Sequence, residues 1–120
     1  MRTSFSPNEE LQQLIFELKK VASIEKVGIW KRVAADLSKP TRQRRIVNIS
    51  RIDRYCNDND VIVVPGKVLS TGDVTHKLSI AAYRFSGMAS EKIKKAQGKV
   101  LTIKELLKSN PKGKGVRIIG

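Results

Sequence analysis

Residues 39–54 read KPTRQRRIVNISRIDR, and this stretch joins a strongly basic loop to segments that bury apolar side chains. The basic loop, 39–45, has no acidic residue and carries four cations: Lys39, Arg42, Arg44 and Arg45. Pro40 disfavours a helical conformation at the residue before it, so we expect a preceding helix to end there. The β-branched run 46–49 is typical of a core strand. The loop is therefore expected to be anchored at both ends.

A short helix is predicted directly after this strand. Ser50 occupies a position typical of a helix N-cap, with Asp53 three residues further on. Over 50–56 the helical spacing turns Ile52, Tyr55 and Cys56 toward the core. Arg51 and Arg54 are three residues apart, so they share the outer face of the helix and extend the basic surface of the loop.

The arginines of this region favour a polyanionic partner. Guanidinium groups bind phosphate in a bidentate manner and stack on bases, which solubility alone does not require. A solvated loop on a basic protein is the simpler alternative.

Charge over the whole chain supports a nucleic acid as that partner. The 120 residues carry a formal net charge of +13, with 12 basic and 8 acidic residues in 1–60 and 12 basic and 3 acidic residues in 61–120. The positive charges of such an excess repel one another, and this repulsion is relieved when phosphates approach. A membrane surface would instead require an amphipathic helix with a cationic face and interfacial aromatic residues, which no candidate helix provides. No apolar run is long enough to span a bilayer, and the single cysteine excludes an internal disulfide. We therefore expect a soluble intracellular protein.

Helical spacing predicts two helices before the basic loop. An amphipathic helix is expected over 7–22, where Ser6, Pro7 and Glu9 form a helix start and leucines and isoleucines line one face. A second helix is expected over 29–37. Its Trp30 lies on the apolar stripe, which favours a core position over a platform for base stacking.

Strands and helices are both predicted after residue 60. A continuous apolar strand at 61–64, covered on both faces, is expected to end at Pro65-Gly66-Lys67. Thr102 and Glu105 form a capping box for a later helix. The other expected elements are a strand over 78–85, a helix begun by Ser86 or Ser90 and closed by Gly98, a strand at 100–101, a basic glycine-rich turn at 110–115 and a strand at 116–119. The order strand, capped helix, turn, strand occurs at 47–64 and again at 100–119, which weakly indicates a repeated β-α-β unit.

Catalytic chemistry is not supported by the residue types present. With one histidine and one cysteine, the chain lacks a nucleophile paired with a base and lacks the ligands of a soft metal site. Cys56 fits a small core residue, whereas His76, in a polar turn, either donates to a phosphate or is solvated. The carboxylates Asp36, Asp53 and Glu105 are explained by capping or by exposure on helix surfaces. We predict no enzyme, no metal, no cofactor and no small-molecule substrate.

Several segments together resemble a known family. They are Ile29-Trp30 with Val33-Ala34, Lys39-Pro40, 47–55 (VNISRIDRY), 63–69 (VVPGKVL) and 110–117 (NPKGKGVR). Over nearly its whole length the chain resembles the archaeal and eukaryotic large-subunit ribosomal protein of the eighteen-e family, in its short archaeal form. The resemblance implies an α/β fold in which 1–120 form a single domain: an irregular β-β-α superhelix, shared with the C-terminal domain of bacterial large-subunit protein fifteen, with an N-terminal amphipathic helix.

The resemblance also implies a structural role in the large ribosomal subunit. The expected partners are large-subunit ribosomal RNA (23S rRNA) and neighbouring ribosomal proteins, in the cytoplasm. We expect a two-part clamp on phosphates of folded RNA. Its first part is Lys39, Arg42, Arg44, Arg45, Arg51 and Arg54, and its second part is Lys67, His76, Lys77, Lys112, Lys114 and Arg117. A free-standing RNA or DNA chaperone outside the ribosome is the alternative.

Overall fold

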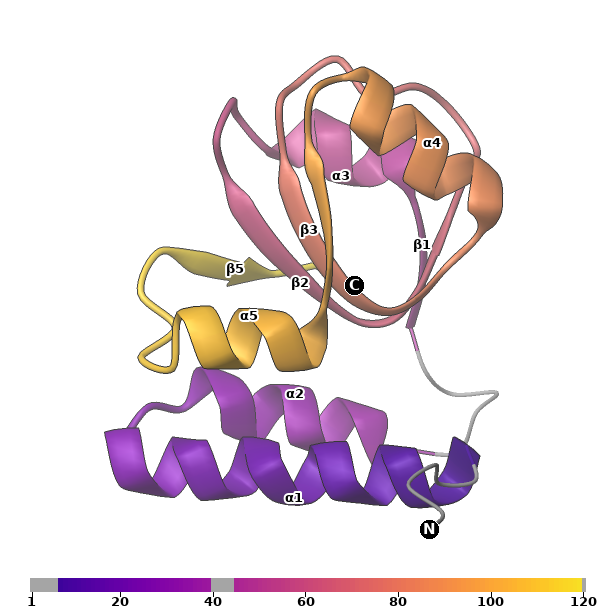
Figure 1. Ribbon diagram of the computed structural model, residues 1–120. Helices are drawn as coiled ribbons and strands as arrows, with labels where there is room; N and C mark the ends of the chain where they lie inside the picture. The colour runs from indigo at the N-terminus through magenta and orange to yellow at the C-terminus, as the bar shows by residue number, and fades with distance from the viewer. Residues whose placement is uncertain (1–6, 40–44, 120) are drawn as a thin grey trace, which may run out of the picture.

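The computed structural model describes residues 7–39 and 45–119. After two N-terminal helices, strands alternate with helices except that β3 follows β2 directly (Figure 1). In chain order the elements are α1 (Pro7–Glu25), α2 (Ile29–Leu37), β1 (Arg45–Asn48), α3 (Ile49–Tyr55), β2 (Val61–Leu69), β3 (Ser79–Phe85), α4 (Gly87–Lys95), β4 (Lys99–Thr102), α5 (Ile103–Ser109) and β5 (Val116–Ile118).

Parallel pairing joins all five strands into one sheet. Four strands follow the order β1-β2-β3-β4, and β5 pairs with β2. One edge of β2 has two partners in succession, because Val61–Val63 pair with β5 and Gly66–Leu69 pair with β1. Glycine is required at position 66, since a Cβ there would lie 1.9 Å from the carbonyl oxygen of Arg45.

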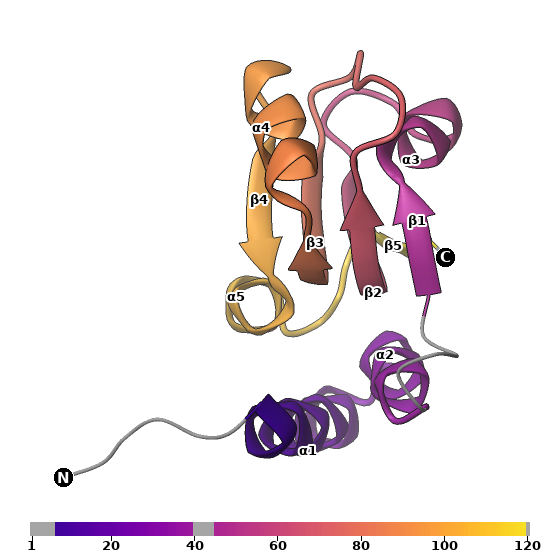
Figure 2. The same ribbon diagram turned by 90° about the vertical axis from the view of Figure 1, so that its right-hand side faces the viewer.

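Helices cover both faces of the sheet, as expected of a parallel arrangement. The figures show α1, α2 and α5 together on one side and α3 and α4 on the other (Figures 1 and 2). Val63 and Ala81 contact the first group, whereas Ile62, Val64 and Ile80 contact the second. The predicted α/β class and the N-terminal helix are confirmed.

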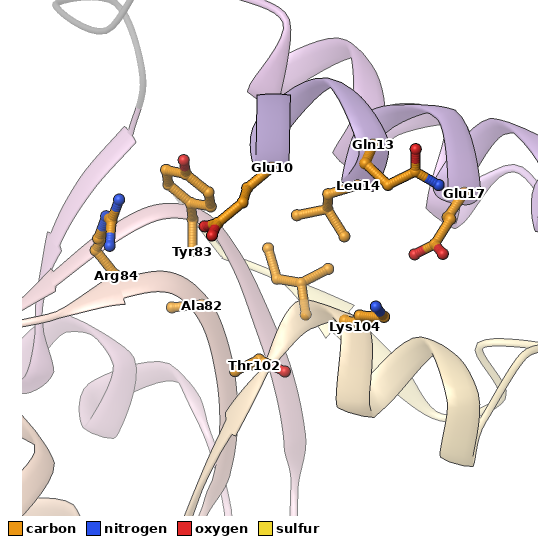
Figure 3. Close-up of a pocket in the computed structure, with 10 residues that line it drawn as sticks. Glu10, Gln13, Leu14, Glu17, Ala82, Tyr83, Arg84, Thr102 and Lys104 are labelled. Atoms are coloured by element: carbon orange, nitrogen blue, oxygen red, sulfur yellow. The ribbon is translucent and has the colours of Figure 1, made fainter. Parts of the chain in front are cut away.

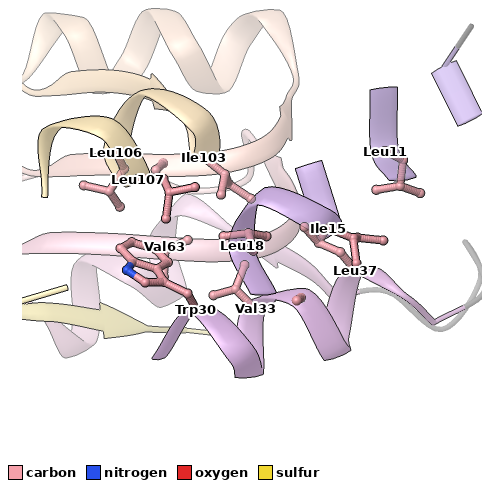
Figure 4. Packing of buried hydrophobic residues seen from close by; sticks show 12 residues of the cluster. Leu11, Ile15, Leu18, Trp30, Val33, Leu37, Val63, Ile103, Leu106 and Leu107 are labelled. Carbon is pink, nitrogen blue, oxygen red and sulfur yellow. The ribbon is translucent and has the colours of Figure 1, made fainter. Parts of the chain in front are cut away.

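Trp30 is a core residue, as its place on the apolar stripe predicts. It is fully buried among Leu18, Val33 and Leu106 (Figure 4). Its Nε1 donates a hydrogen bond of 2.7 Å to the carbonyl oxygen of Pro111. A buried indole N–H needs such a partner, so Trp30 also fastens the turn at 110–115 to α2.

Two predicted boundaries are wrong. Helix α1 continues to Glu25, beyond the expected end at residue 22. Strand β2 does not end at Pro65 but runs on to Leu69. Proline is tolerated in this strand because the pairing with β3 shifts register between Val64 and Lys67, and such a bulge places the missing N–H where no ladder bond is needed.

The start of α3 also differs from the prediction. The helix begins one residue earlier, at Ile49, so Asn48 and not Ser50 occupies the N-cap position. The backbone N–H of Ser50 donates instead to the carbonyl oxygen of Thr71. Ile52 and Cys56 are buried as expected, but Tyr55 is 57% exposed. It lies on the outer face with Arg51 and Arg54, because positions 51, 54 and 55 share one side of a helix.

Other predicted features agree with the structure. Ser86, and not Ser90, caps α4, since its hydroxyl accepts from the N–H of Ala89. Both hydrogen bonds of the capping box are present: the Thr102 hydroxyl accepts from the N–H of Glu105, and the Glu105 carboxylate accepts from the N–H of Thr102. Burial raises the pKa of the Cys56 thiol, which confirms a core cysteine and not a thiolate nucleophile.

Candidate nucleic-acid interface

Both described ends of the basic loop are tied to one carboxylate. Asp36, near the end of α2, is only 8% exposed. Lys39 Nζ lies 3.2 Å from Asp36 Oδ1, and Arg45 Nε lies 3.6 Å from Asp36 Oδ2. The prediction that Asp36 is a helix-surface group is therefore wrong. A buried carboxylate needs nearby cations, so Lys39 and Arg45 compensate the charge of Asp36 as well as adding to the positive potential of this region. Arg42 and Arg44 lie outside the described residues.

A second carboxylate fastens the segment 70–77 to α3. The side chain of Asp53, which is 13% exposed, accepts from the backbone N–H groups of Thr75 (2.9 Å) and His76 (3.0 Å). It also accepts from the Thr75 hydroxyl at 2.7 Å, and His76 Nδ1 lies 2.8 Å from its Oδ1. Burial alone would raise the pKa of Asp53, but the hydrogen bonds from Thr75 and His76 outweigh it and lower the pKa. Asp53 therefore connects α3 to the segment 70–77 and does not act as a helix cap, and the partner of the His76 ring is Asp53.

The same segment is held from α4 on its other side. Lys92 Nζ donates to the carbonyl oxygens of Ser70 (2.9 Å) and Gly72 (2.8 Å). Gly72, at φ +93°, packs so closely on Ser50 that a Cβ would approach the serine Cβ to 2.3 Å. Residues 70–77 thus form a fixed bridge between α3 and α4, and Lys92 has a structural role there.

Exposed cationic side chains and one exposed aromatic ring lie near this bridge. Arg51, Arg54 and Lys77 are exposed cations, and Tyr55 presents an aromatic ring beside the two arginines. Phosphate contacts with guanidinium and ammonium groups, and stacking of an unpaired base on tyrosine, are both compatible with this arrangement. Arg117 reaches the same region from β5, where its Nη1 donates to the carbonyl oxygen of Tyr55 at 2.9 Å.

The basic turn at 110–115 is fixed against α2. Asn110 Nδ2 donates to the carbonyl oxygen of Lys114, and Asn110 Oδ1 accepts from the N–H of the same residue. Gly113 adopts φ +64°, and a Cβ there would lie 2.5 Å from a side-chain carbon of Ile29. The side chains of Lys112 and Lys114 are exposed. This turn lies at the start of α2 and the loop 39–45 at its end, so the nine residues of α2 separate the two by about 13 Å.

The structure groups the predicted cations differently from the expected two-part clamp. Lys67 is exposed and pairs in register with Ile46, so it lies beside the basic loop. His76 and Lys77 lie beside α3, together with Arg51 and Arg54. Only Lys112 and Lys114 occupy the turn near the start of α2. The predicted contact residues that the structure describes therefore form three groups: the loop group (Lys39, Arg45, Lys67), the α3 group (Arg51, Arg54, His76, Lys77, Arg117) and the turn group (Lys112, Lys114).

Sequence reasoning missed the positioning roles of Asp36, Asp53 and Lys92. Asp53 and Lys92 contact a segment about 20 residues away, so no local pattern marks them. Asp36 lies three residues before Lys39, and this spacing is a local signal that could have indicated its ion pair. Among the described residues no cluster of three or more His, Cys, Asp or Glu side chains could hold a metal ion. No helix within that part of the chain is long and apolar enough to cross a membrane.

Comparison with known proteins agrees with the resemblance drawn from the motifs. The family described as ribosomal protein 60S L18 and 50S L18e matches residues 8–120. The chain belongs to this family. It is 43% identical over 118 residues to large ribosomal subunit protein eL18 of Methanoregula boonei, with 98% of each chain covered. It is also 44% identical over 112 residues to the protein of that name from Archaeoglobus fulgidus, covering 93% of this chain and 96% of the relative.

Family membership decides two of the sequence predictions. The family consists of structural ribosomal proteins, which confirms that this chain is not an enzyme. A relative from Pyrobaculum aerophilum, 43% identical over 112 residues, carries the same name, large ribosomal subunit protein eL18. A ribosomal role is thereby favoured over that of a free-standing chaperone.

Proposed function

We propose that this chain, as one domain over 1–120, is a structural component of the cytoplasmic large ribosomal subunit that binds folded 23S rRNA and adjoins other ribosomal proteins. Its membership in the L18e family supports the ribosomal role. One structural observation supports the RNA-binding mechanism: exposed cations lie on or beside segments that the chain's own side chains hold in place. Asp36 contacts the described ends of the basic loop, Asp53 and Lys92 hold the bridge at 70–77, and Asn110 holds the turn.

Fixed cations suit folded RNA better than a flexible strand. Folded RNA brings phosphates close together in a defined arrangement, and a pre-positioned set of charges binds them without first losing conformational entropy. The proposed contact residues are the twelve predicted from the sequence, eleven lysines and arginines together with His76, and among them Arg42 and Arg44 belong to the undescribed part of the loop. Tyr55 adds an exposed ring on which a base can stack.

Sedimentation tests the ribosomal role. The chain should co-migrate stoichiometrically with the large subunit through a sucrose gradient at moderate salt, and its absence from that peak would refute the proposal. Binding of the purified chain to a fragment of large-subunit rRNA tests the mechanism. If about eight phosphates are neutralised, the slope of log K against log salt concentration should be around −7.

A pair of double variants separates specific contacts from general charge. Arg51→Ala with Arg54→Ala should weaken RNA binding, because both side chains are exposed and lie beside the bridge. Lys19→Ala with Lys20→Ala removes the same charge from an exposed part of α1 and should weaken binding much less. Equal losses in the two double variants would show that only the net charge matters. Arg45 is unsuitable for this test, because its loss would also leave Asp36 with one cation fewer.

A further inference from the structure

The pocket between α1 and the elements β3, β4 and α5 does not favour one kind of ligand. Its walls carry Glu10 and Glu17 together with Arg84 and Lys104, so charges of both signs border the same space (Figure 3). The α3 group offers a more specific feature. One of its members, His76, has a ring whose hydrogen-bonding roles are fixed by the chain itself.

Asp53 determines which nitrogen of the His76 ring carries the proton. Nδ1 lies 2.8 Å from Asp53 Oδ1. Burial would raise the pKa of Asp53, but the hydrogen bonds from Thr75 and His76 lower it on balance, so Asp53 is a carboxylate and can only accept. The Thr75 hydroxyl lies 3.5 Å from Nδ1, but it donates its own hydrogen to Asp53 Oδ2 at 2.7 Å. Nδ1 is therefore the donor, and in the neutral ring Nε2 is an acceptor.

The acceptor Nε2 is open to a ligand. The side chain of His76 is 33% exposed. Within the described residues no hydrogen bond involves Nε2, and this atom is not among the buried polar atoms without a partner, so it faces solvent. The backbone N–H of His76 also donates to Asp53, at 3.0 Å, so both the backbone and the ring of this residue are held. The position of the acceptor is thus set before any ligand binds.

The surroundings of His76 attract RNA, but a phosphate does not suit this acceptor. Arg54 and Lys77, which directly follow Asp53 and His76 in the chain, are exposed cations. Phosphate oxygens carry negative charge and no hydrogen to donate, so they bind these cations and not a neutral Nε2. Along an RNA backbone the ribose 2′-hydroxyl is the donor, and it belongs to the same nucleotides as the phosphates. DNA has no such group.

We propose that His76 accepts a hydrogen bond from a ribose 2′-hydroxyl and so lets this chain distinguish RNA from DNA at the α3 group. Arg54 and Lys77 bind the neighbouring phosphates, and Asp53 holds the ring in its accepting tautomer. This role rests on the proposed function, because that function brings folded RNA to this surface. A lysine or arginine could not take the place of His76, since both only donate.

Interference mapping with 2′-deoxynucleotides tests this proposal. A fragment of large-subunit rRNA carries one 2′-deoxynucleotide at a random position in each molecule, and the bound and free pools are compared position by position at about pH 8.5, where a histidine ring is neutral. With the wild type, at least one position should show binding weakened about three- to tenfold by loss of the hydroxyl. His76→Asn keeps a donor for Asp53 at the place of Nδ1 but has no acceptor at the place of Nε2. With this variant the same position should show no effect, and affinity for unmodified RNA should fall by a similar factor.

Lys77→Ala is the matched control, because it removes an exposed neighbour of His76 that binds phosphate. It should weaken RNA binding and its dependence on salt, with the interference pattern unchanged. A wild type without an interfering position would overturn the proposal by itself, as would the same pattern in wild type and in folded His76→Asn. Either result leaves the proposed function intact as long as the chain binds the fragment. A chain that binds no fragment would refute the proposed RNA contact, and the role of His76 with it. Circular dichroism checks that the variants are folded.

Discussion

Replacing Asp53 by alanine should weaken RNA binding even though it makes the chain more basic. The substitution removes the acceptor for the N–H groups of Thr75 and His76, for the Thr75 hydroxyl and for the His76 ring. The bridge at 70–77 then loses the Asp53 contacts to α3 and keeps the contacts of Ser50 with Thr71 and Gly72 and those of Lys92. A model based on net charge alone predicts the opposite result, because one negative charge is lost from a surface that attracts phosphates.

The expected magnitude follows from the exposure of the bonds. A hydrogen bond to a charged group contributes about 1.5–3 kcal/mol when shielded from water. The bonds from Thr75 are exposed and water replaces them at little cost, so we expect the free energy of unfolding to fall by about 2–3 kcal/mol in total. For RNA, loss of the bridge geometry should weaken binding by about three- to tenfold, or about 1 kcal/mol.

Asp73→Ala is the matched control, because Asp73 is an exposed aspartate of the same segment and its loss changes the charge equally. This variant should bind RNA as tightly as the wild type or more tightly, with little change in stability. Urea denaturation measures stability, and fluorescence anisotropy with an rRNA fragment at fixed salt measures affinity. The reasoning is refuted if the folded Asp53→Ala chain binds RNA as tightly as Asp73→Ala.

The same carboxylate predicts a dependence of stability on pH. The folded pKa of Asp53 lies below its ordinary value of 3.8, so the charged form is stabilised by folding. Its contribution is complete above the unfolded pKa and is lost as pH falls through the folded pKa. The difference in unfolding free energy between wild type and Asp53→Ala should therefore shrink as the pH falls below about 4. A difference that stays the same below that pH would contradict this assignment.

Three further substitutions test the fold. Gly66→Ala should destabilise the chain by about 3 kcal/mol in urea denaturation, because its Cβ would meet the carbonyl oxygen of Arg45 in the β1–β2 pair; a neutral result would rule out that pairing. Trp30→Phe should lower the free energy of unfolding by about 2 kcal/mol, since the hydrogen bond to Pro111 and part of the packing are lost; an unchanged unfolding midpoint by circular dichroism would show that the bond contributes nothing. Thr102→Ala should lower the free energy of unfolding by about 1 kcal/mol through loss of the helix cap, and Thr102→Ser should restore stability if capping is the cause.

Local patterns in the sequence predicted most of the elements. Helical spacing identified α2 to the residue, and the pair Thr102 and Glu105 marked the start of α5, because both signals depend only on neighbours within one turn. Trp30 could be assigned to the core for the same reason. The exposed Tyr55 was misassigned, since position 55 lies one turn from both the exposed Arg51 and the buried Ile52, and helical spacing allows either side.

Pairing between strands that are distant in sequence determined the features that local patterns could not predict. Pro65 and Gly66 read as the end of a strand, but β1 pairs with β2 from Gly66 onward and a register shift accommodates the proline. The sequence alone could predict which cations lie in loops and turns, because loops and turns are local features of the chain. It could not predict which cations lie close together in space, because Asp53 meets His76 only after α3 and the segment 70–77 come together.

The edge of β2 that two strands share has a consequence for the order of folding. The half of this edge next to β1 can form as soon as β2 has been synthesised, because β1 and α3 directly precede it. The other half stays open until β5, which follows every other strand in the chain, becomes available for Val61–Val63. During synthesis the nascent chain therefore exposes unpaired backbone groups on a central apolar strand, a surface prone to association with other chains. Pairing of β5 with Val61–Val63 closes this part of the edge only after the whole chain is available.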